Sequence, residues 1–238
     1  MNKRTLWILI LAGAGFLAAV LGVYVFREWN TSPPSAPVRP PDVQSIRTRA
    51  EAGDASAQNA LGDLYAKGEW VPQSNSEAVK WYRTAADKGF ADAQYNLATL
   101  YDVGQGLPQD EAAALKWYLL AAEQGHAGAN YNLATLYTNG RGVPPNAVEA
   151  AKYYLRAAEL GESLAQYNIA RRYEVGKGVP VDRVEAYKWH KLAARQGIDD
   201  AANAIATLKG LMTRVEIAEG QRRADAFIVS KPPGAPAK

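Results

Sequence analysis

Residues 93–128 read AQYNLATLYDVGQGLPQDEAAALKWYLLAAEQGHAG, and this stretch returns with small changes on both sides of itself. A constant step of 36 residues separates Ala57, Ala93, Ala129, Ala165 and Ala201. The same step separates Tyr65, Tyr101, Tyr137 and Tyr173, and also Pro72, Pro108, Pro144 and Pro180. A fixed period of this length marks a solenoid or a propeller, because one unit cannot bury its apolar face alone and must stack on its neighbours. The repeat therefore decides the fold.

Each repeat carries the apolar spacing of two helices. Ala93, Leu97 and Leu100 recur at steps of three and four, and a second helical pattern follows the loop. The first helix is predicted to end at a glycine that can take the left-handed conformation, namely Gly68, Gly104, Gly140 or Gly176. The second helix is predicted to begin after an N-capping side chain, Ser74, Asp110, Asn146 or Asp182, and to end at Gly89, Gly125, Gly161 or Gly197. A glutamate three residues after the cap predicts capping boxes at Glu77, Glu149 and Glu185.

The frame A-x-x-x-L-[GA]-x-x-Y-x-x-G-x-[GW]-[VL]-P, followed by A-x-K-[WY]-[YH]-x-x-A-A-x-x-G, resembles the Sel-one-like repeat over about residues 45–228. This resemblance implies an all-α fold, a right-handed α-solenoid of antiparallel helix pairs of the tetratricopeptide type. Members of the family are mostly scaffolds, adaptors and partner-binding proteins, and bacterial members are often secreted or bound to the cell envelope. The resemblance therefore implies a binding role.

Composition narrows the possible chemistry. The net charge of +3 comes without a basic stripe, so nucleic-acid binding is not expected. The chain has no cysteine and only two histidines, His126 and His190, which lie too far apart in sequence for a zinc signature. His190 stands where the other repeats have tyrosine and is interpreted as a packing residue. We expect no catalytic residues, no metal, no cofactor and no enzyme activity.

The N-terminal region predicts a membrane anchor. After the basic residues 1–5, Leu6–Phe26 is a run without charge that is long enough to span the hydrocarbon core of about 30 Å. A cleaved signal peptide is the alternative, but its apolar region is shorter and its small residues follow that region. Lys3 and Arg4 favour a cytoplasmic N-terminus, which makes the chain a single-pass inner-membrane protein with its repeats in the periplasm or another extracytoplasmic compartment.

Small residues at Ala14, Ala18 and Gly22 share one face of this span and suggest self-association of the helix. The alternative is that alanine and glycine are simply common in membrane spans. Residues 27–42 are rich in proline and predict a semi-rigid linker.

The remaining chain divides by the repeat frame. Residues 43–56 predict an N-terminal capping half-repeat, and four whole repeats follow at 57–92, 93–128, 129–164 and 165–200. Residues 201–229 predict C-terminal capping helices, the last of which begins with a capping box at Thr213 and Glu216. The tail 230–238 is predicted to be disordered.

One side of the first helices is the candidate partner-binding surface. If Ala93, Leu97 and Leu100 face the core, then the opposite side lines the concave surface of the solenoid. We call it the first-helix face; its candidate residues are Asn59, Tyr95, Tyr131 and Tyr167, then Asp63, Thr99, Thr135 and Arg171, then Asp102, Thr138 and Glu174. The tyrosines suit an interface because they combine a large apolar surface with a polar tip. Alternatively, they belong to the repeat frame and pack against the next helix.

Two residues depart from the frame. Trp70 replaces Gly106, Gly142 and Gly178, which predicts a stiffer first loop with an exposed aromatic ring. Arg172 replaces the core leucines of the other repeats, and a buried arginine needs a partner. Either it reaches Asp199 or Asp200, or the local packing differs near the end of the array.

The sequence thus predicts a membrane-anchored scaffold or adaptor for protein or peptide partners in the cell envelope. An envelope hydrolase or enzyme inhibitor that uses the same concave surface is the alternative. A third possibility is a structural role in a membrane complex through the N-terminal helix. The partner's identity and the oligomeric state do not follow from the sequence.

Overall fold

The computed structural model describes residues 42–230, which contain helices and no strand. The predicted membrane span, most of the linker and residues 231–238 lie outside this range. Within it, no helix has the length and apolar character needed to cross a membrane. The helices are α2 (Val43–Glu51), α3 (Ala55–Lys67), α4 (Asn75–Ala86), α5 (Ala91–Val103), α6 (Glu111–Glu123), α7 (Ala127–Asn139), α8 (Ala147–Glu159), α9 (Ser163–Val175), α10 (Arg183–Arg195), α11 (Asp199–Lys209) and α12 (Arg214–Asp225).

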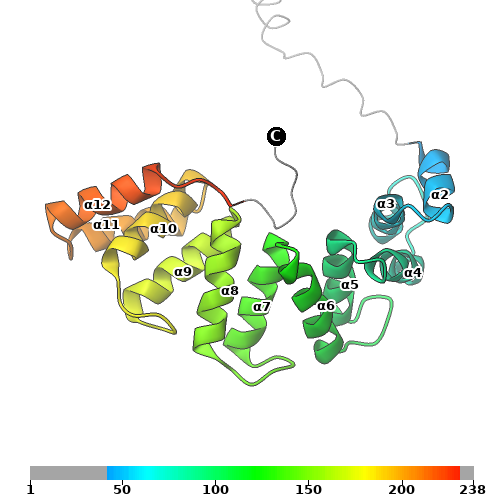
Figure 1. Ribbon diagram of the computed structural model, residues 1–238, viewed down its shortest axis with the longest axis horizontal. Helices are drawn as coiled ribbons and strands as arrows, with labels where there is room; N and C mark the ends of the chain where they lie inside the picture. Colours follow the sequence, from blue (N-terminus) through cyan, green and yellow to red (C-terminus); the bar gives the residue numbers. More distant parts are fainter. Residues whose placement is uncertain (1–41, 231–238) are drawn as a thin grey trace, which may run out of the picture. The chain divides into compact units, whose positions relative to one another are not determined.

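Consecutive helices from α2 to α11 pack side by side in chain order, and α12 packs on α10 (Figure 1). In each of the four repeats the first helix packs against the second, in the pairs α3 and α4, α5 and α6, α7 and α8, and α9 and α10. Each second helix also contacts the helix that follows it, which for α10 is α11. Fully buried alanines and leucines such as Ala93, Leu97 and Leu133 form the core with buried tyrosines from the second helices. The all-helical solenoid predicted from the period is confirmed for the described residues.

Local signals set the ends of the first helices and the starts of the second helices where the sequence predicts them, whereas the second helices end at Ala86, Glu123, Glu159 and Arg195, shortly before the predicted glycines. The glycines that follow the first helices are left-handed, with φ between 70° and 72°, and each donates its N–H to a carbonyl in the last turn. Ser74, Asp110, Asn146 and Asp182 each accept a backbone N–H at the start of a second helix. Both features satisfy backbone groups that a helix end leaves without partners.

The predicted capping boxes at Glu77, Glu149 and Glu185 form only in part, so that prediction is wrong. The backbone N–H that each glutamate should bind is already donated to a tyrosine carbonyl of the first helix, for example from Ser74 to Tyr65 at 2.9 Å. The glutamates instead pair with the lysine three residues later. Only the box at Thr213 and Glu216, outside the repeats, is complete.

The loop glycines mark close contacts between repeats. A Cβ on Gly178 would lie 1.9 Å from the carbonyl oxygen of Ala147, the first residue of the preceding second helix. Gly106 and Gly142 approach the preceding second helix in the same way. Trp70 occupies this position in the first repeat with φ of 65°, and its side chain is 56% exposed, as the sequence predicts.

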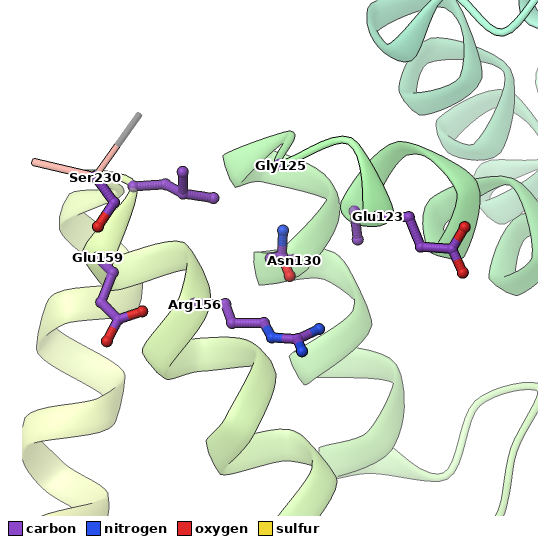
Figure 2. A pocket seen from close by; sticks show the side chains of 8 residues that line it. Glu123, Gly125, Asn130, Arg156, Glu159 and Ser230 are labelled. Atoms are coloured by element: carbon purple, nitrogen blue, oxygen red, sulfur yellow. The ribbon is translucent and has the colours of Figure 1, made fainter. Parts of the chain in front are cut away.

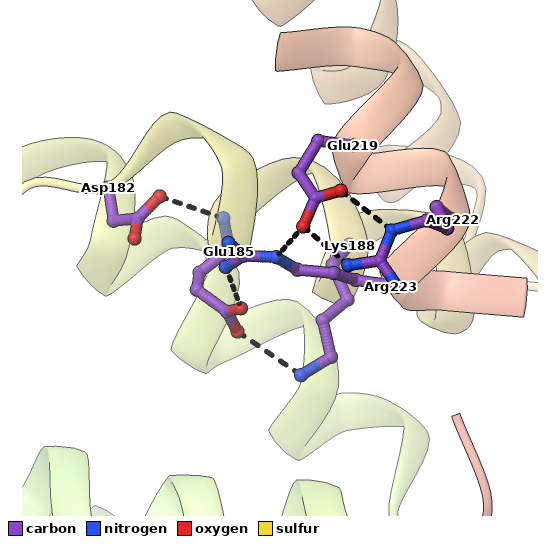
Figure 3. A network of polar contacts seen from close by, with 6 residues as sticks. All are labelled: Asp182, Glu185, Lys188, Glu219, Arg222 and Arg223. Atoms are coloured by element: carbon purple, nitrogen blue, oxygen red, sulfur yellow. Dashed lines mark hydrogen bonds and ion pairs between the residues drawn. The ribbon is translucent and has the colours of Figure 1, made fainter. Parts of the chain in front are cut away.

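The C-terminal helix α12 packs on α10 and covers the end of the array. Gly220 permits the close approach, because a Cβ there would lie 2.8 Å from the ring of Tyr187. At the edge of this contact, Arg223 donates to Glu185 of α10 at 2.7 Å and to Glu219 at 2.8 Å (Figure 3). Ser230 follows α12 and donates its N–H to the carbonyl of Glu159 at 2.8 Å, so this residue is held against the end of α8 rather than forming the start of a free tail.

Candidate functional site

Beneath the first-helix face lies a layer of hydrogen bonds. It is built around one repeated position of the second helices, which carries Tyr82, Tyr118, Tyr154 and His190. In the second repeat, the hydroxyl of the buried Tyr118 lies 3.2 Å from Thr99 Oγ1 and accepts from Asn132 Nδ2 of the next repeat at 2.8 Å. Burial raises the pKa of Tyr118 to about 12, so this hydroxyl stays protonated. Thr135 makes the corresponding contact with Tyr154 at 3.3 Å. The threonines therefore link the two helices of a repeat.

The first repeat uses charge in the same layer. Asp63 accepts from the hydroxyl of Tyr82 at 2.7 Å, and Asn96 of the second repeat donates to both Asp63 and Asn59. Asn59 is only 8% exposed. This residue therefore belongs to the interior of the first two repeats rather than to a surface.

The predicted tyrosine ladder is half-buried. Tyr95 stacks on His126, the N-cap residue of α7, with ring centroids 4.3 Å apart, and Tyr131 meets Tyr154 edge to face at 5.7 Å. Tyr167 lies 5.4 Å from His190, and the guanidinium of Arg171 lies over its ring. Each tyrosine thus uses part of its ring for packing and leaves part of it at the first-helix face.

Asp102 holds the second and third repeats together. Arg141, in the loop of the third repeat, donates to Asp102 at 2.6 Å and to Glu111 at 2.9 Å. Sequence reasoning missed Arg141, because its position carries Glu69, Gln105 and Lys177 in the other repeats and gives no repeated signal.

The fourth repeat replaces this layer with ionisable groups. His190 is fully buried, and its Nε2 lies 3.0 Å from Glu174 Oε1. Burial lowers the pKa of His190, and the nearby Glu174 opposes this shift without reversing it. His190 thus packs as expected, while Arg171 points outward and is exposed.

Arg172 is buried, with 6% of its surface exposed, but the predicted pairing with Asp199 or Asp200 is wrong. Its guanidinium points back to the third repeat, where it donates to Thr138 Oγ1 at 2.6 Å and to the carbonyl of Ala147 at 3.3 Å, and it lies over the ring of Tyr154. It also donates to the carbonyl of Lys177. The side chain of Arg172 packs against the preceding repeat, as the core leucines do in the other repeats. It therefore points away from Asp199 and Asp200 in α11.

A cavity of about 260 Å³ opens beside Arg172 on the first-helix face. It is lined by Thr138, Tyr154, Asn168, Arg171, Arg172, Glu174, Val175 and Lys177. Among the described residues, none of its three cations has a carboxylate within ion-pair distance, and its one acid, Glu174, is engaged by His190. Such an arrangement attracts an anionic group, because no carboxylate neutralises the charge of these cations, two of which are exposed.

His126 has a structural role that the sequence did not reveal. Its Nδ1 accepts the N–H of Ala129 at 3.1 Å and caps α7, while Nε2 lies 3.7 Å from Asp92. Burial lowers the pKa of His126. Between residues 42 and 230, no group of three or more histidine, cysteine, aspartate or glutamate side chains is placed to hold a metal ion.

Comparison with known proteins identifies the repeat. The family model of the Sel1 repeat matches residues 55–90, 91–126, 127–162 and 163–198, which is more than half of the chain. The chain belongs to the Sel1 repeat family. The matched units begin where α3, α5, α7 and α9 begin. Sel1 repeat proteins are typically non-catalytic scaffolds that mediate protein–protein interaction.

Two solved structures share this fold at 30% sequence identity. One is a protective antigen of uropathogenic Escherichia coli that displays an SLR fold, with a TM-score of 0.70 over 77% of this chain and 40% of the antigen. The other is a Sel1 repeat protein from Oxalobacter formigenes, with a TM-score of 0.67 over 78% of this chain and 75% of that protein. The chain thus spans less than half of the antigen. No curated protein matches this Sel1 repeat chain.

Proposed function

We propose that this Sel1 repeat protein is a scaffold of the cell envelope, anchored in the inner membrane by residues 6–26, that binds an acidic segment of a protein partner on the first-helix face. The cationic cavity beside Arg172 carries this proposal. Three cations line it without a carboxylate partner in the described part of the chain. Arg172 is buried and donates only to a hydroxyl and two carbonyls, whereas Arg171 and Lys177 are exposed.

The partner's acid group supplies the missing charge. Planar guanidinium groups bind carboxylates through two parallel hydrogen bonds, and Arg171 and Lys177 are exposed at the rim, where they attract an approaching acid. The half-buried rings of Tyr131 and Tyr167 provide apolar contact beside the cavity. Binding of this kind weakens as salt concentration rises, because the rim charges are screened.

The test is proximity crosslinking in cells followed by capture, with the full chain beside the double variant Arg171→Gln/Lys177→Gln. Both side chains are exposed, so the variant keeps the fold. The matched control is Lys116→Gln/Lys209→Gln, which removes two exposed lysines away from the cavity. The proposal expects specific envelope proteins that the control retains and the cavity variant loses. Equal capture by the two variants refutes it.

The proposed anchor rests on the uncharged run Leu6–Phe26 behind Lys3 and Arg4. Membrane fractionation and protease protection of the full chain test it. The repeats should sediment with the membrane. Added protease should digest them in spheroplasts, in which the outer face of the inner membrane is exposed. Release of the full chain by alkaline carbonate, or protection of the repeats in spheroplasts, contradicts this arrangement.

A further inference from the structure

A second cavity of about 430 Å³ lies where α6, α7 and α8 meet, away from the first-helix face (Figure 2). Its lining includes Ala122 of α6, Asn130 of α7, and Arg156 and Leu160 at the end of α8. The cavity lies where the third repeat differs from the second and fourth at two positions, which carry Asn130 and Leu160 instead of glutamine.

Glutamine side chains occupy this place elsewhere. Gln58, Gln94 and Gln166 each donate Nε2 to an alanine carbonyl at the end of the preceding second helix, at 2.9 Å, 3.2 Å and 3.2 Å. In the second and fourth repeats a second glutamine completes the arrangement. Gln124 donates to Gln94 at 2.8 Å, and Gln196 donates to Gln166 at 2.9 Å. A carboxamide pair thus joins neighbouring helices.

The third repeat lacks both glutamines. The corresponding residues are Asn130 and Leu160. Asn130 is one methylene shorter, and its Nδ2 donates to the carbonyl of His126 at 3.0 Å instead of reaching Ala122. This contact establishes which atom of the amide is oxygen, because only the nitrogen can donate to a carbonyl.

Asn130 therefore has an acceptor without a donor. The residue is 1% exposed, and its Oδ1 has no hydrogen-bond partner in the described part of the chain. A buried polar atom in this state costs free energy until a donor reaches it. Asn130 and Arg156 both line the cavity and come from the neighbouring helices α7 and α8 (Figure 2), so an acceptor and a set of donors border the same space.

We propose that this cavity binds a primary carboxamide, either the side chain of a glutamine or asparagine in a partner protein or a free small amide. The amide NH₂ of the ligand donates to Asn130 Oδ1, as Gln124 and Gln196 donate to the oxygens of Gln94 and Gln166. It also donates to the carbonyl of Ala122, which corresponds to the alanine carbonyls that Gln94 and Gln166 bind. The amide oxygen accepts from Arg156. A carboxylate ligand lacks the donor that Asn130 needs, so the site discriminates against acids, in contrast to the cationic cavity near Arg172.

The test is NMR titration of the full chain, observed at the side-chain N–H signals of Asn130 and Arg156. The probes are N-acetyl-glutamine methylamide, its glutamate counterpart, and propionamide as a free amide, each at about 10 mM, which is tenfold above a weak-site Kd of about 1 mM. The variant Asn130→Gln/Leu160→Gln rebuilds the glutamine pair and should close the site. The reverse change, Gln94→Asn/Gln124→Leu, should leave the same acceptor unpaired in the second repeat but bind the amide more weakly, because Leu120 stands there in place of Arg156.

The proposal expects the glutamine probe to shift both signals, the glutamate probe to bind at least tenfold more weakly, and the rebuilt variant to melt at a higher temperature while losing the shifts. Binding of propionamide as well indicates a free amide as a ligand, whereas binding of the peptide probe alone indicates a partner's side chain. The proposal is overturned if no probe shifts the signals, since ordered water then satisfies Asn130. Equal binding of the acid, or unchanged binding by the rebuilt variant, also overturns it.

Discussion

The contact between the loop at Gly178 and the preceding repeat allows a sharp test of how the repeats are joined. Gly178 has φ of +81°, and a Cβ there would lie 1.9 Å from Ala147 O and 2.4 Å from its carbonyl carbon. Gly89 has nearly the same φ, +84°, but a Cβ there has no neighbour within 4 Å. The two glycines therefore separate backbone strain from collision between repeats.

In both Gly178→Ala and Gly89→Ala, an alanine must adopt left-handed backbone, which costs about 1–2 kcal/mol. Part of this cost is offset because alanine also lowers the conformational entropy of the unfolded chain. Gly89→Ala should therefore lower the free energy of unfolding by about 1 kcal/mol. In Gly178→Ala the new Cβ also collides with the backbone carbonyl of Ala147, which cannot rotate away as a side chain could, so the loop must shift. Because overpacking costs about 1–3 kcal/mol, this variant should lose about 2–4 kcal/mol in total.

Thermal melts of the full chain by circular dichroism measure the difference. For a domain of this size each kcal/mol shifts the melting temperature by about 2–4 °C. Amide hydrogen exchange then locates the change, since protection should fall at the junction of the third and fourth repeats in Gly178→Ala and not in Gly89→Ala. Equal shifts in melting temperature for the two variants would refute the argument that the glycine is required by the neighbouring repeat.

Three further predictions concern side chains. Trp70→Gly removes an exposed ring and relieves the left-handed strain at φ of 65°, so the melting temperature should stay within about 3 °C of the parent or rise; a larger fall shows that the ring is packed. Tyr118→Phe removes the acceptor of Asn132 and should lower the free energy of unfolding by about 1–3 kcal/mol in urea, with an unchanged value contradicting the buried layer. Burial lowers the pKa of His126 and His190 below the unfolded value of 6.5, so both favour folding above pH 6.5 and this stability is lost as pH falls through their folded pKa. Melting temperature should therefore fall from about pH 7.5 to about pH 5, and less so in His126→Asn/His190→Tyr; an equal fall in the variant assigns the loss to other groups.

Arg172 illustrates where sequence reasoning succeeds and where it fails. Its place among core leucines correctly predicts burial and the need for partners. The direction of the side chain does not follow from the sequence, because acidic residues nearby in the chain are not those nearest in space. Thr138 and the carbonyl of Ala147, in the preceding repeat, supply the contacts instead.

The capping glutamates show the same limit at a helix end. Glu77 has the correct spacing for a capping box, but Tyr65 already accepts the N–H of Ser74. The competitor is nine residues away in sequence and becomes adjacent only when the two helices pair. Asn130 differs from its glutamine counterparts by a single methylene, and its unpaired oxygen becomes evident only when the ends of the helices are placed.

The sequence alone determined the period, the paired helices, their caps and the alternation of core and surface, because these depend on interactions within a few residues and on a spacing that every repeat restates. The tertiary structure decided which polar side chains are used to join repeats and which remain at a surface. Those contacts link residues about one repeat apart in the sequence, as between Arg141 and Asp102 or Arg223 and Glu185. Which residues become partners depends on how the helices are placed in space. Both cavities arise where a repeat departs from the frame: in the described part of the chain, Arg172 has no carboxylate to neutralise its charge, and Asn130 Oδ1 has no donor.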